Sequence, residues 1–170
     1  AIISSEPWLT LNSVLNHLLP NSKTGPSAVD IRALNYLYNI MYVQPTEQDE
    51  KDFILKGVGW LNGYANSQLK KTFIDLTFNE KEKTLRGISG SRAGGNWLST
   101  LIGYIFEAML APPAYGGNPN GIGWKWLDHQ AGFPLPKEGD RYYELPGQQS
   151  AKQNSSQAAS KPRLQKIRVT

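Results

Sequence analysis

The segment from Ala114 to Trp126 constrains the fold of this chain more than any other part of it. Its sequence, AYGGNPNGIGWKW, follows directly on an apolar helical pattern and contains four glycines, two asparagines, a proline and three large aromatic residues. Glycine and asparagine reach left-handed backbone conformations at low cost, so this cluster predicts a loop with one defined shape. Tyr115, Trp124 and Trp126 provide that loop with large side chains to bury or to present to a partner.

The composition excludes several kinds of chemistry. The 170 residues include no cysteine, which removes disulfides, thiolate metal sites and thiol nucleophiles. A chain of this length supports one hydrophobic core but not two. The most apolar window, Trp97 to Ala111, is interrupted by Glu107 and is shorter than the ~18 to 20 residues that span a bilayer. We therefore expect one domain with no membrane span.

The positive charge of the chain is concentrated at its C-terminal end. The net charge is +4, yet residues 151–170 contain five cations and no acid. The remainder has 13 cations and 14 acids. Such a near-neutral body lacks the basic face that nucleic-acid-binding domains present to phosphates, so no nucleic-acid partner is expected.

Apolar residues recur at three- and four-residue spacing over most of the chain before Ala111. This period is typical of amphipathic helices, and no alternating strand pattern runs longer than a few residues. The predicted fold class is all-α, with about five helices and a long irregular C-terminal third rich in glycine, proline and aromatic residues. The helices are expected over Pro7–Leu18, Ser27–Tyr42, Thr46–Leu69, Asn79–Ile88 and Asn96–Leu110, with a helical turn near Trp124–His129.

Three helix starts carry capping signals. Thr77 with Glu80 forms a regular capping box, Thr46 with Asp49 forms a variant of it, and Ser27 is a good N-cap residue. These signals predict where the second, third and fourth helices begin.

The helix predicted over Asn96–Leu110 is apolar nearly all round, which favours a central position in the core. Trp8, Trp60, Trp97 and the tyrosines of the helical segments are expected in the core as well. The glycines between positions 87 and 95 are expected to interrupt the helical pattern before this helix.

The C-terminal third has a different character. Residues 1–147 are predicted to form a single helical domain, in which Gly132–Pro136 is extended because each residue before a proline avoids the helix. Residues 148–170 are polar and basic, so they are expected to form a tail that is flexible or bound to a partner.

Few residues suggest catalysis, cofactor binding or metal binding. Gly121 and Gly123 resemble the start of a dinucleotide fingerprint, but a third glycine and a preceding strand are missing. His17 and His129 are the only imidazoles and lack metal-ligand spacing. Asp128 could orient His129, yet neighbouring residues on a helix do not face one another. We therefore assign no catalytic, cofactor or metal residue, and an accessory subunit is favoured over an enzyme.

Three motifs carry a family resemblance. They are Pro113-Ala114-Tyr115-Gly116-Gly117-Asn118, Gly121-Ile122-Gly123-Trp124-Lys125 and Gly132-Phe133-Pro134. Together they resemble the signature of the gluconate 2-dehydrogenase subunit 3 family, the small subunit of bacterial membrane-associated flavin dehydrogenases. Supporting similarity lies upstream, in Leu18-Leu19-Pro20, in Gly25-Pro26 and in the segment from Phe73 to Glu80, and the whole covers roughly residues 8 to 136. The insertion Leu127–Gln130 and the long tail depart from the common pattern and leave the substrate open.

The resemblance implies a non-catalytic subunit without a cofactor of its own. In such complexes a large GMC-type subunit uses FAD to oxidise a sugar or sugar acid, and a multihaem cytochrome c subunit passes the electrons to the quinone pool. The small subunit is expected to assist assembly, stability or export of the flavoprotein. Family members typically carry a twin-arginine signal, so the resemblance implies that the chain, which shows no leader at Ala1–Ser5, is processed or truncated and is periplasmic.

The loop and its surroundings supply the candidate partner interface. Its members, in the loop motifs and just after them, are Tyr115, Gly116, Gly117, Asn118, Trp124, Lys125, Trp126 and Phe133. Whether the aromatic side chains face this chain's own core or a partner is open at this point. Two alternatives also stay open: a free-standing export chaperone for the flavoprotein, and a small enzyme that uses His129 with Asp128.

Overall fold

The computed structural model describes residues 4–130 and 138–139. The chain divides into two units, Ala1–Ala131 and Gly132–Thr170, and the described helices belong to the first. The predictions for Phe133, for the extended segment to Pro136, for a domain end at residue 147 and for the tail lie outside the described residues.

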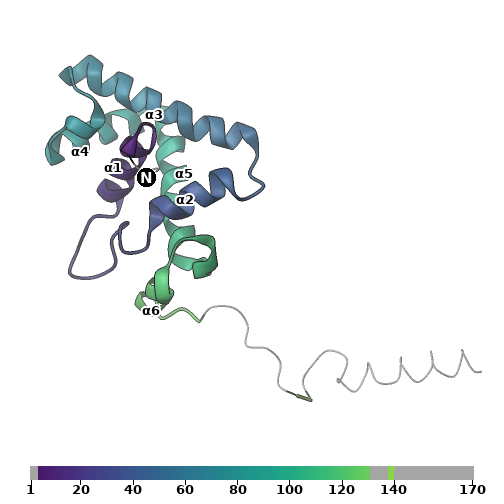
Figure 1. Cartoon of the computed structure of the whole chain (residues 1–170). Coiled ribbons are helices and arrows are strands. Elements are labelled where there is room, and N and C mark those ends of the chain that lie inside the picture. Colours follow the sequence, from purple (N-terminus) through teal and green to yellow (C-terminus); the bar gives the residue numbers. More distant parts are fainter. Residues whose placement is uncertain (1–3, 131–137, 140–170) are drawn as a thin grey trace, which may run out of the picture. The chain divides into compact units, whose positions relative to one another are not determined.

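The described residues form six α-helices and no strand, which confirms the all-α class. The helices are α1 (Trp8–Leu18), α2 (Ala33–Tyr42), α3 (Gln48–Leu69), α4 (Phe78–Ser89), α5 (Arg92–Leu110) and α6 (Ile122–Trp126) (Figure 1). Single 3-10 turns lie at Phe73–Asp75, Pro113–Tyr115 and Pro119–Gly121. None of these helices combines the length and the apolar character needed to cross a membrane, as far as the described part of the chain shows.

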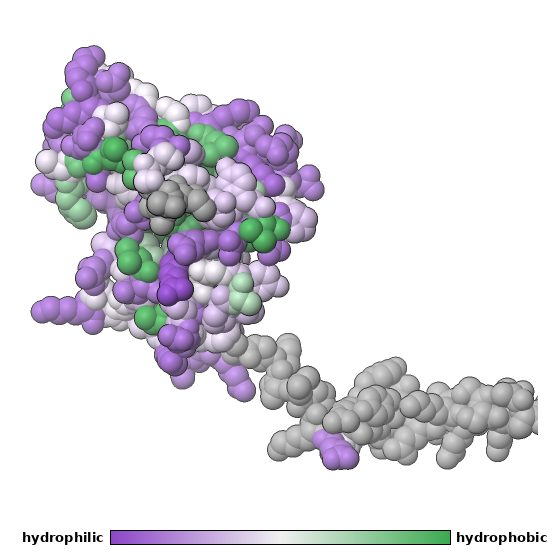
Figure 2. Space-filling model, in the orientation of Figure 1, coloured by the Kyte–Doolittle hydropathy of each residue, from purple (hydrophilic) through white to green (hydrophobic). Residues whose placement is uncertain are grey.

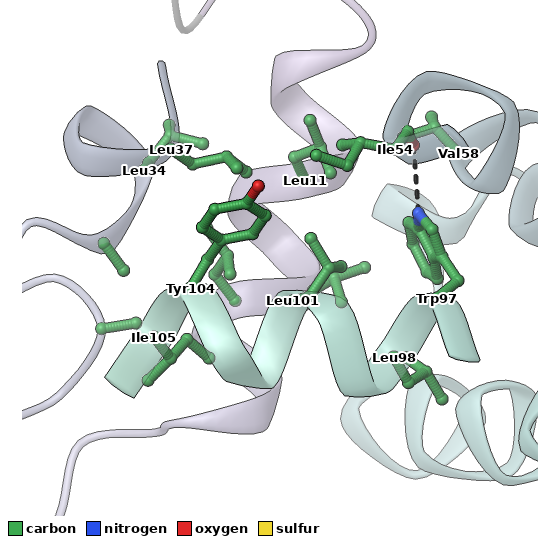
Figure 3. Packing of buried hydrophobic residues seen from close by; sticks show 14 of the residues in the cluster. Leu11, Leu34, Leu37, Ile54, Val58, Trp97, Leu98, Leu101, Tyr104 and Ile105 are labelled. Atoms are coloured by element: carbon green, nitrogen blue, oxygen red, sulfur yellow. Dashed lines mark hydrogen bonds between the residues drawn. The ribbon is translucent and has the colours of Figure 1, made fainter. Parts of the chain in front are cut away.

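Helix α5 is the centre of the fold, as its apolar sequence predicted. It contacts each of the other five α-helices. Figure 3 shows Trp97 and Tyr104 extending from α5 toward side chains of α1, α2 and α3. The indole N–H of the fully buried Trp97 donates a hydrogen bond to the Ile54 carbonyl, at 3.0 Å. Leu101 is also fully buried, and burial of one such side chain contributes about 1.5–3 kcal/mol.

The predicted interruption before α5 is confirmed at Gly90 and Ser91, but the predicted start at Asn96 is wrong, because the helix already begins at Arg92. The Ser91 hydroxyl caps it by accepting a hydrogen bond from the Gly94 N–H, at 3.0 Å. Gly94 lies inside the helix, and a Cβ placed there would overlap the carbonyl oxygen of Ile88. The glycine therefore allows α4 and α5 to approach closely, which outweighs its low helix propensity.

The capping box at the start of α4 is confirmed. The Glu80 N–H donates to the Thr77 hydroxyl at 3.4 Å, and the Thr77 N–H donates to the Glu80 carboxylate at 2.7 Å. The bond from the Thr77 N–H, followed by the Thr77 side chain, lowers the pKa of the Glu80 carboxyl below its ordinary value. The similar prediction for Thr46 and Asp49 is wrong, because the Thr46 hydroxyl donates instead to the Ile40 carbonyl, at 2.7 Å.

The prediction that Ser27 caps α2 is also wrong, although its side chain does form a cap. The Asp30 carboxylate accepts hydrogen bonds from the Ser27 N–H at 2.8 Å and from its hydroxyl at 2.7 Å, which lowers the Asp30 pKa. The resulting turn ends at Arg32, whose φ of 55° is left-handed, and α2 begins one residue later. Ser27 therefore caps an isolated turn.

The aromatic residues expected in the core divide into two groups. Trp8, Trp97, Tyr36 and Tyr104 are buried as predicted. The prediction is wrong for Trp60, Tyr42 and Tyr64, whose exposed fractions are 44%, 56% and 37%. A broad apolar helix face exceeds what one neighbouring helix covers, so its edges stay in solvent. On the face drawn in Figure 2, strongly hydrophobic residues lie in separate patches among polar ones.

Candidate partner interface

The predicted loop folds back against the C-terminal end of α5. We call residues 112–128 the capping loop; it contains two 3-10 turns and then α6. Gly116, Asn118, Asn120 and Gly121 have φ values of 91°, 47°, 54° and 66°, all left-handed. The expected use of glycine and asparagine is confirmed. The predicted helical turn near Trp124 also exists, but α6 begins at Ile122 and ends at Trp126, before His129.

Asn118 holds the capping loop together. It is fully buried, and its side-chain amide donates to the Ala111 carbonyl at 3.1 Å. Its side-chain oxygen accepts from the Gly123 N–H at 2.7 Å, and its main-chain N–H donates to the Ile31 carbonyl at 2.9 Å. One residue thus joins the end of α5, the start of α6 and the turn before α2.

Three glycines allow the capping loop to approach its neighbours. A Cβ on Gly117 would lie 2.7 Å from the Ala108 carbonyl oxygen, and one on Gly123 would overlap that of Met109. A Cβ on Gly116 would overlap the side-chain amide of Asn39, which donates to the Tyr115 carbonyl at 3.0 Å. These residues therefore determine the shape of the loop.

The two tryptophans of the capping loop bond to this chain through their ring N–H groups. Trp124 donates to the Leu110 carbonyl and Trp126 to the Thr24 carbonyl, each at 2.6 Å. The last carbonyls of a helix lack partners within it, so Trp124 and Asn118 satisfy two groups at the end of α5. The Trp126 ring lies against Gly25, where a Cβ would be 2.5 Å from it.

The aromatic side chains of the capping loop contact this chain on one side and remain partly exposed to solvent. Tyr115 and Trp126 keep exposed fractions of 44% and 48%, while Trp124 is half-buried. Lys125 is exposed as well. The hydrogen-bonding edges of the indoles are thus directed to this chain, and parts of their ring surfaces remain available. Among the predicted interface residues, Asn118 and Gly117 are buried and act on the shape of the loop.

An exposed apolar face on α5 was missed by the sequence reasoning. Ile102, Phe106 and Leu110 follow one another at four-residue spacing and are 39%, 57% and 40% exposed. Residues at this spacing lie on one side of a helix. These three side chains form an apolar stripe. It ends at the capping loop, where the Leu110 carbonyl accepts the hydrogen bond from the Trp124 indole N–H. The available signal was the apolar character of α5 all round, which exceeds what core packing requires.

Two buried tyrosines join α5 to α2 and α3. The Tyr36 hydroxyl donates to the Glu107 carboxylate at 3.1 Å, and burial together with that carboxylate raises the pKa of Tyr36 to about 12. The Tyr104 hydroxyl donates to Glu50, and burial followed by the Glu50 contact raises its pKa too. Both phenols are therefore neutral donors near neutral pH, and their roles are structural.

Asp128 and His129 do not form the carboxylate-histidine pair that the enzyme alternative requires. No hydrogen bond joins the side chains of Asp128 and His129 in the described structure; the His129 main-chain N–H donates to the Trp124 carbonyl at 2.8 Å. Both residues are exposed beside an open groove of about 700 Å³. His17 is buried 2.8 Å from the Glu82 carboxylate, a contact that lowers the Glu82 pKa. No group of three acidic or histidine side chains suitable for a metal occurs in residues 4–130.

Comparison with known proteins agrees with the motifs of the capping loop. The family described as Gluconate 2-dehydrogenase subunit 3 matches residues 5–132, which include the six described α-helices and the capping loop. No curated protein and no solved structure gives a significant match.

Proposed function

The chain belongs to the gluconate 2-dehydrogenase subunit 3 family, and we propose from this premise that it is the non-catalytic small subunit of a periplasmic, FAD-dependent dehydrogenase complex. Its role there is to hold the GMC-type flavin subunit in a stable, exportable form. FAD belongs to that large subunit and haem to a cytochrome c subunit, and the substrate is a sugar or sugar acid.

The exposed apolar face next to the capping loop is the observation that carries this proposal beyond the family name. Ile102, Phe106 and Leu110 form an apolar stripe that ends where the Leu110 carbonyl accepts the Trp124 indole N–H of the loop. Contiguous apolar surface of this kind is typical of protein-protein contacts. A subunit that acts by binding needs such a surface and needs no catalytic group.

Co-expression with the flavin subunit tests the proposal. An affinity tag on this chain is expected to recover both subunits in a fixed ratio from the mature periplasmic fraction, with intrinsic dye-linked flavin activity. Absence of the flavin subunit would overturn the proposal. Recovery of the pair only before export would instead support the export chaperone.

A surface substitution then locates the contact. Phe106→Ser is expected to reduce recovery of the flavin subunit while changing the free energy of unfolding of the isolated chain by no more than about 0.5 kcal/mol. Val43→Ser is the matched control, since Val43 is 66% exposed at the C-terminal end of α2 and not on the α5 stripe. Equal recovery with both variants would refute a contact at Phe106.

A further inference from the structure

A second apolar surface lies away from the capping loop, where α3, α4 and the start of α5 converge. It is a groove of about 340 Å³, which we call the three-helix groove. It is lined by Trp60 and Tyr64 of α3, which we call the aromatic wall, and by Ile88 of α4 and Trp97 of α5. Neither the family motifs nor the proposed role of the capping loop accounts for it.

Glycines create the groove by bringing the three helices together. A Cβ on Gly57 would overlap the Trp97 ring, and a Cβ on Gly87 would overlap the Tyr64 hydroxyl. With Gly94 against Ile88, each pair of helices therefore has a glycine at its contact. Close helix approach fixes the walls, so the groove exists before any partner arrives.

The aromatic wall is held in place but left uncovered. The Phe53 ring meets the Trp60 ring edge-on, with centroids 5.8 Å apart, which restricts the indole. Trp60 and Tyr64 nevertheless keep 44% and 37% of their surface exposed. Gly59 and Gly63, beside Trp60 on α3, would place a Cβ in open space. A partner segment can therefore reach this wall without displacing a side chain.

Cations outnumber acids in the sequence around the groove. Within four residues of its lining along the chain the charged side chains are Lys56, Lys83, Arg86 and Arg92, and the nearest acids in sequence are Asp52 and Glu82, each five residues from a lining glycine. Arg86 pairs with Glu82 at 2.6 Å. The other three cations form no ion pair with any residue that the structure describes. The lining also includes the N-terminal turn of α5, whose dipole adds positive potential.

We propose that the three-helix groove binds a segment of the flavin subunit in which a bulky apolar side chain is flanked by carboxylates. The apolar side chain fits between Trp60, Tyr64 and Ile88, and the carboxylates meet the cationic rim. An aromatic wall with arginine and lysine at its edge has the composition of an interface hot spot with a charged rim. This inference rests on the proposed function and adds a second contact, distinct from the α5 face.

Site-specific photo-crosslinking tests the occupant. Trp60 is replaced by p-benzoylphenylalanine in the full chain, which is co-expressed with the flavin subunit, and the same replacement at Val43 is the control. Irradiation is expected to link position 60, but not position 43, to a flavin-subunit peptide that contains Asp or Glu beside the attachment point. A complex that assembles without this crosslink, or with a peptide lacking acids, would overturn the groove proposal alone. If the unmodified chains do not associate, the proposed function fails and this inference fails with it.

Charge reversal provides an independent measurement. The double variant Lys83→Glu/Arg92→Glu is expected to raise the Kd of the complex at least tenfold at low salt, and the difference is expected to shrink at high salt. Lys51→Glu/Lys70→Glu changes the net charge equally at one residue of α3 and at its C-cap residue, neither of which lines the groove. An equal rise in Kd for both double variants would mean that only net charge matters, which would contradict a docked acidic segment.

Discussion

Asn118→Ala is the substitution whose effect the structure defines most closely. It removes the hydrogen bonds to the Ala111 carbonyl and from the Gly123 N–H and leaves both groups without that partner inside the capping loop. It also places a residue that tolerates left-handed geometry less well than asparagine at a φ of 47°. The substitution therefore combines a hydrogen-bond loss with a backbone penalty.

The expected loss can be worked out from these two parts. Each buried polar group left unsatisfied costs about 1–3 kcal/mol, and the left-handed backbone costs about 1 kcal/mol for alanine. Because Ala111 is only half-buried, water compensates part of its loss, and the total is about 3–5 kcal/mol. For a chain of this length that lowers the Tm by roughly 10 °C.

Two comparison variants separate the parts. Asn118→Gly loses the same hydrogen bonds without the backbone penalty, so it is expected to be about 1 kcal/mol more stable than Asn118→Ala. Asn120→Ala is the control, because Asn120 is also left-handed, at a φ of 54°, but is exposed and makes no side-chain hydrogen bond in the described structure. It is expected to cost only about 1 kcal/mol.

Urea unfolding followed by circular dichroism gives the free energy of each variant, and amide exchange at Gly123 reports whether the loop opens by itself. The hydrogen-bond reasoning is refuted if Asn118→Ala costs no more than Asn120→Ala and the Gly123 amide keeps its protection.

Three further outcomes follow from single contacts. Gly94→Ala is expected to destabilise the chain by about 1–3 kcal/mol in thermal unfolding, because the added methyl group crowds the Ile88 carbonyl. Gly103→Ala, in open space on the same helix, is expected to stabilise the chain by about 0.5–1 kcal/mol. Similar effects of the two substitutions would contradict the close approach of α4 and α5. Because the pKa of Glu80 is lowered in the folded state, its contribution to stability is present above the ordinary pKa of 4.5 and is lost as pH falls through the folded pKa. The free energy of unfolding of Glu80→Gln should therefore fall less steeply with acid. An unchanged slope would argue that the capping box is not the source of this pH dependence. Trp126→Phe loses the hydrogen bond to the Thr24 carbonyl and is expected to reduce the free energy of unfolding by at most about 1.5 kcal/mol. Trypsin is expected to cut faster after Lys23, the residue before Thr24. Unchanged cleavage would show that the indole does not restrain the loop around Thr24.

The helix starts show which features can be predicted from neighbouring residues alone. The Thr77 and Glu80 box formed as predicted because both partners belong to the same four residues, and the Lys71 contact with the Glu80 carboxylate leaves it intact. Thr46 has an equally good local pattern, but the Ile40 carbonyl at the end of α2 takes its hydroxyl. Ser27 also formed its local bonds, and the left-handed Arg32 then prevented the turn from continuing as a helix.

The candidate interface divides in the same way. The left-handed residues of the capping loop could be predicted from glycine and asparagine alone. That the Trp124 and Trp126 N–H groups bond to Leu110 and Thr24 could not, because those acceptors lie 14 and 102 residues away in sequence. The exposure of Phe106 could not be predicted either, because an apolar residue at this helical spacing is compatible with a core position and with a docking surface.

The sequence by itself determined the all-α class, the approximate helix spans, the family and the presence of a shaped loop after α5. These depend on periodicity, capping and backbone preference, which act between residues a few positions apart. Only the tertiary structure decided that Gly94 lies inside a helix, that Asn118 is the buried centre of the loop, and that Trp60 and Phe106 remain exposed. Each of these depends on which surfaces other helices cover, and that is set by contacts between residues far apart in the chain.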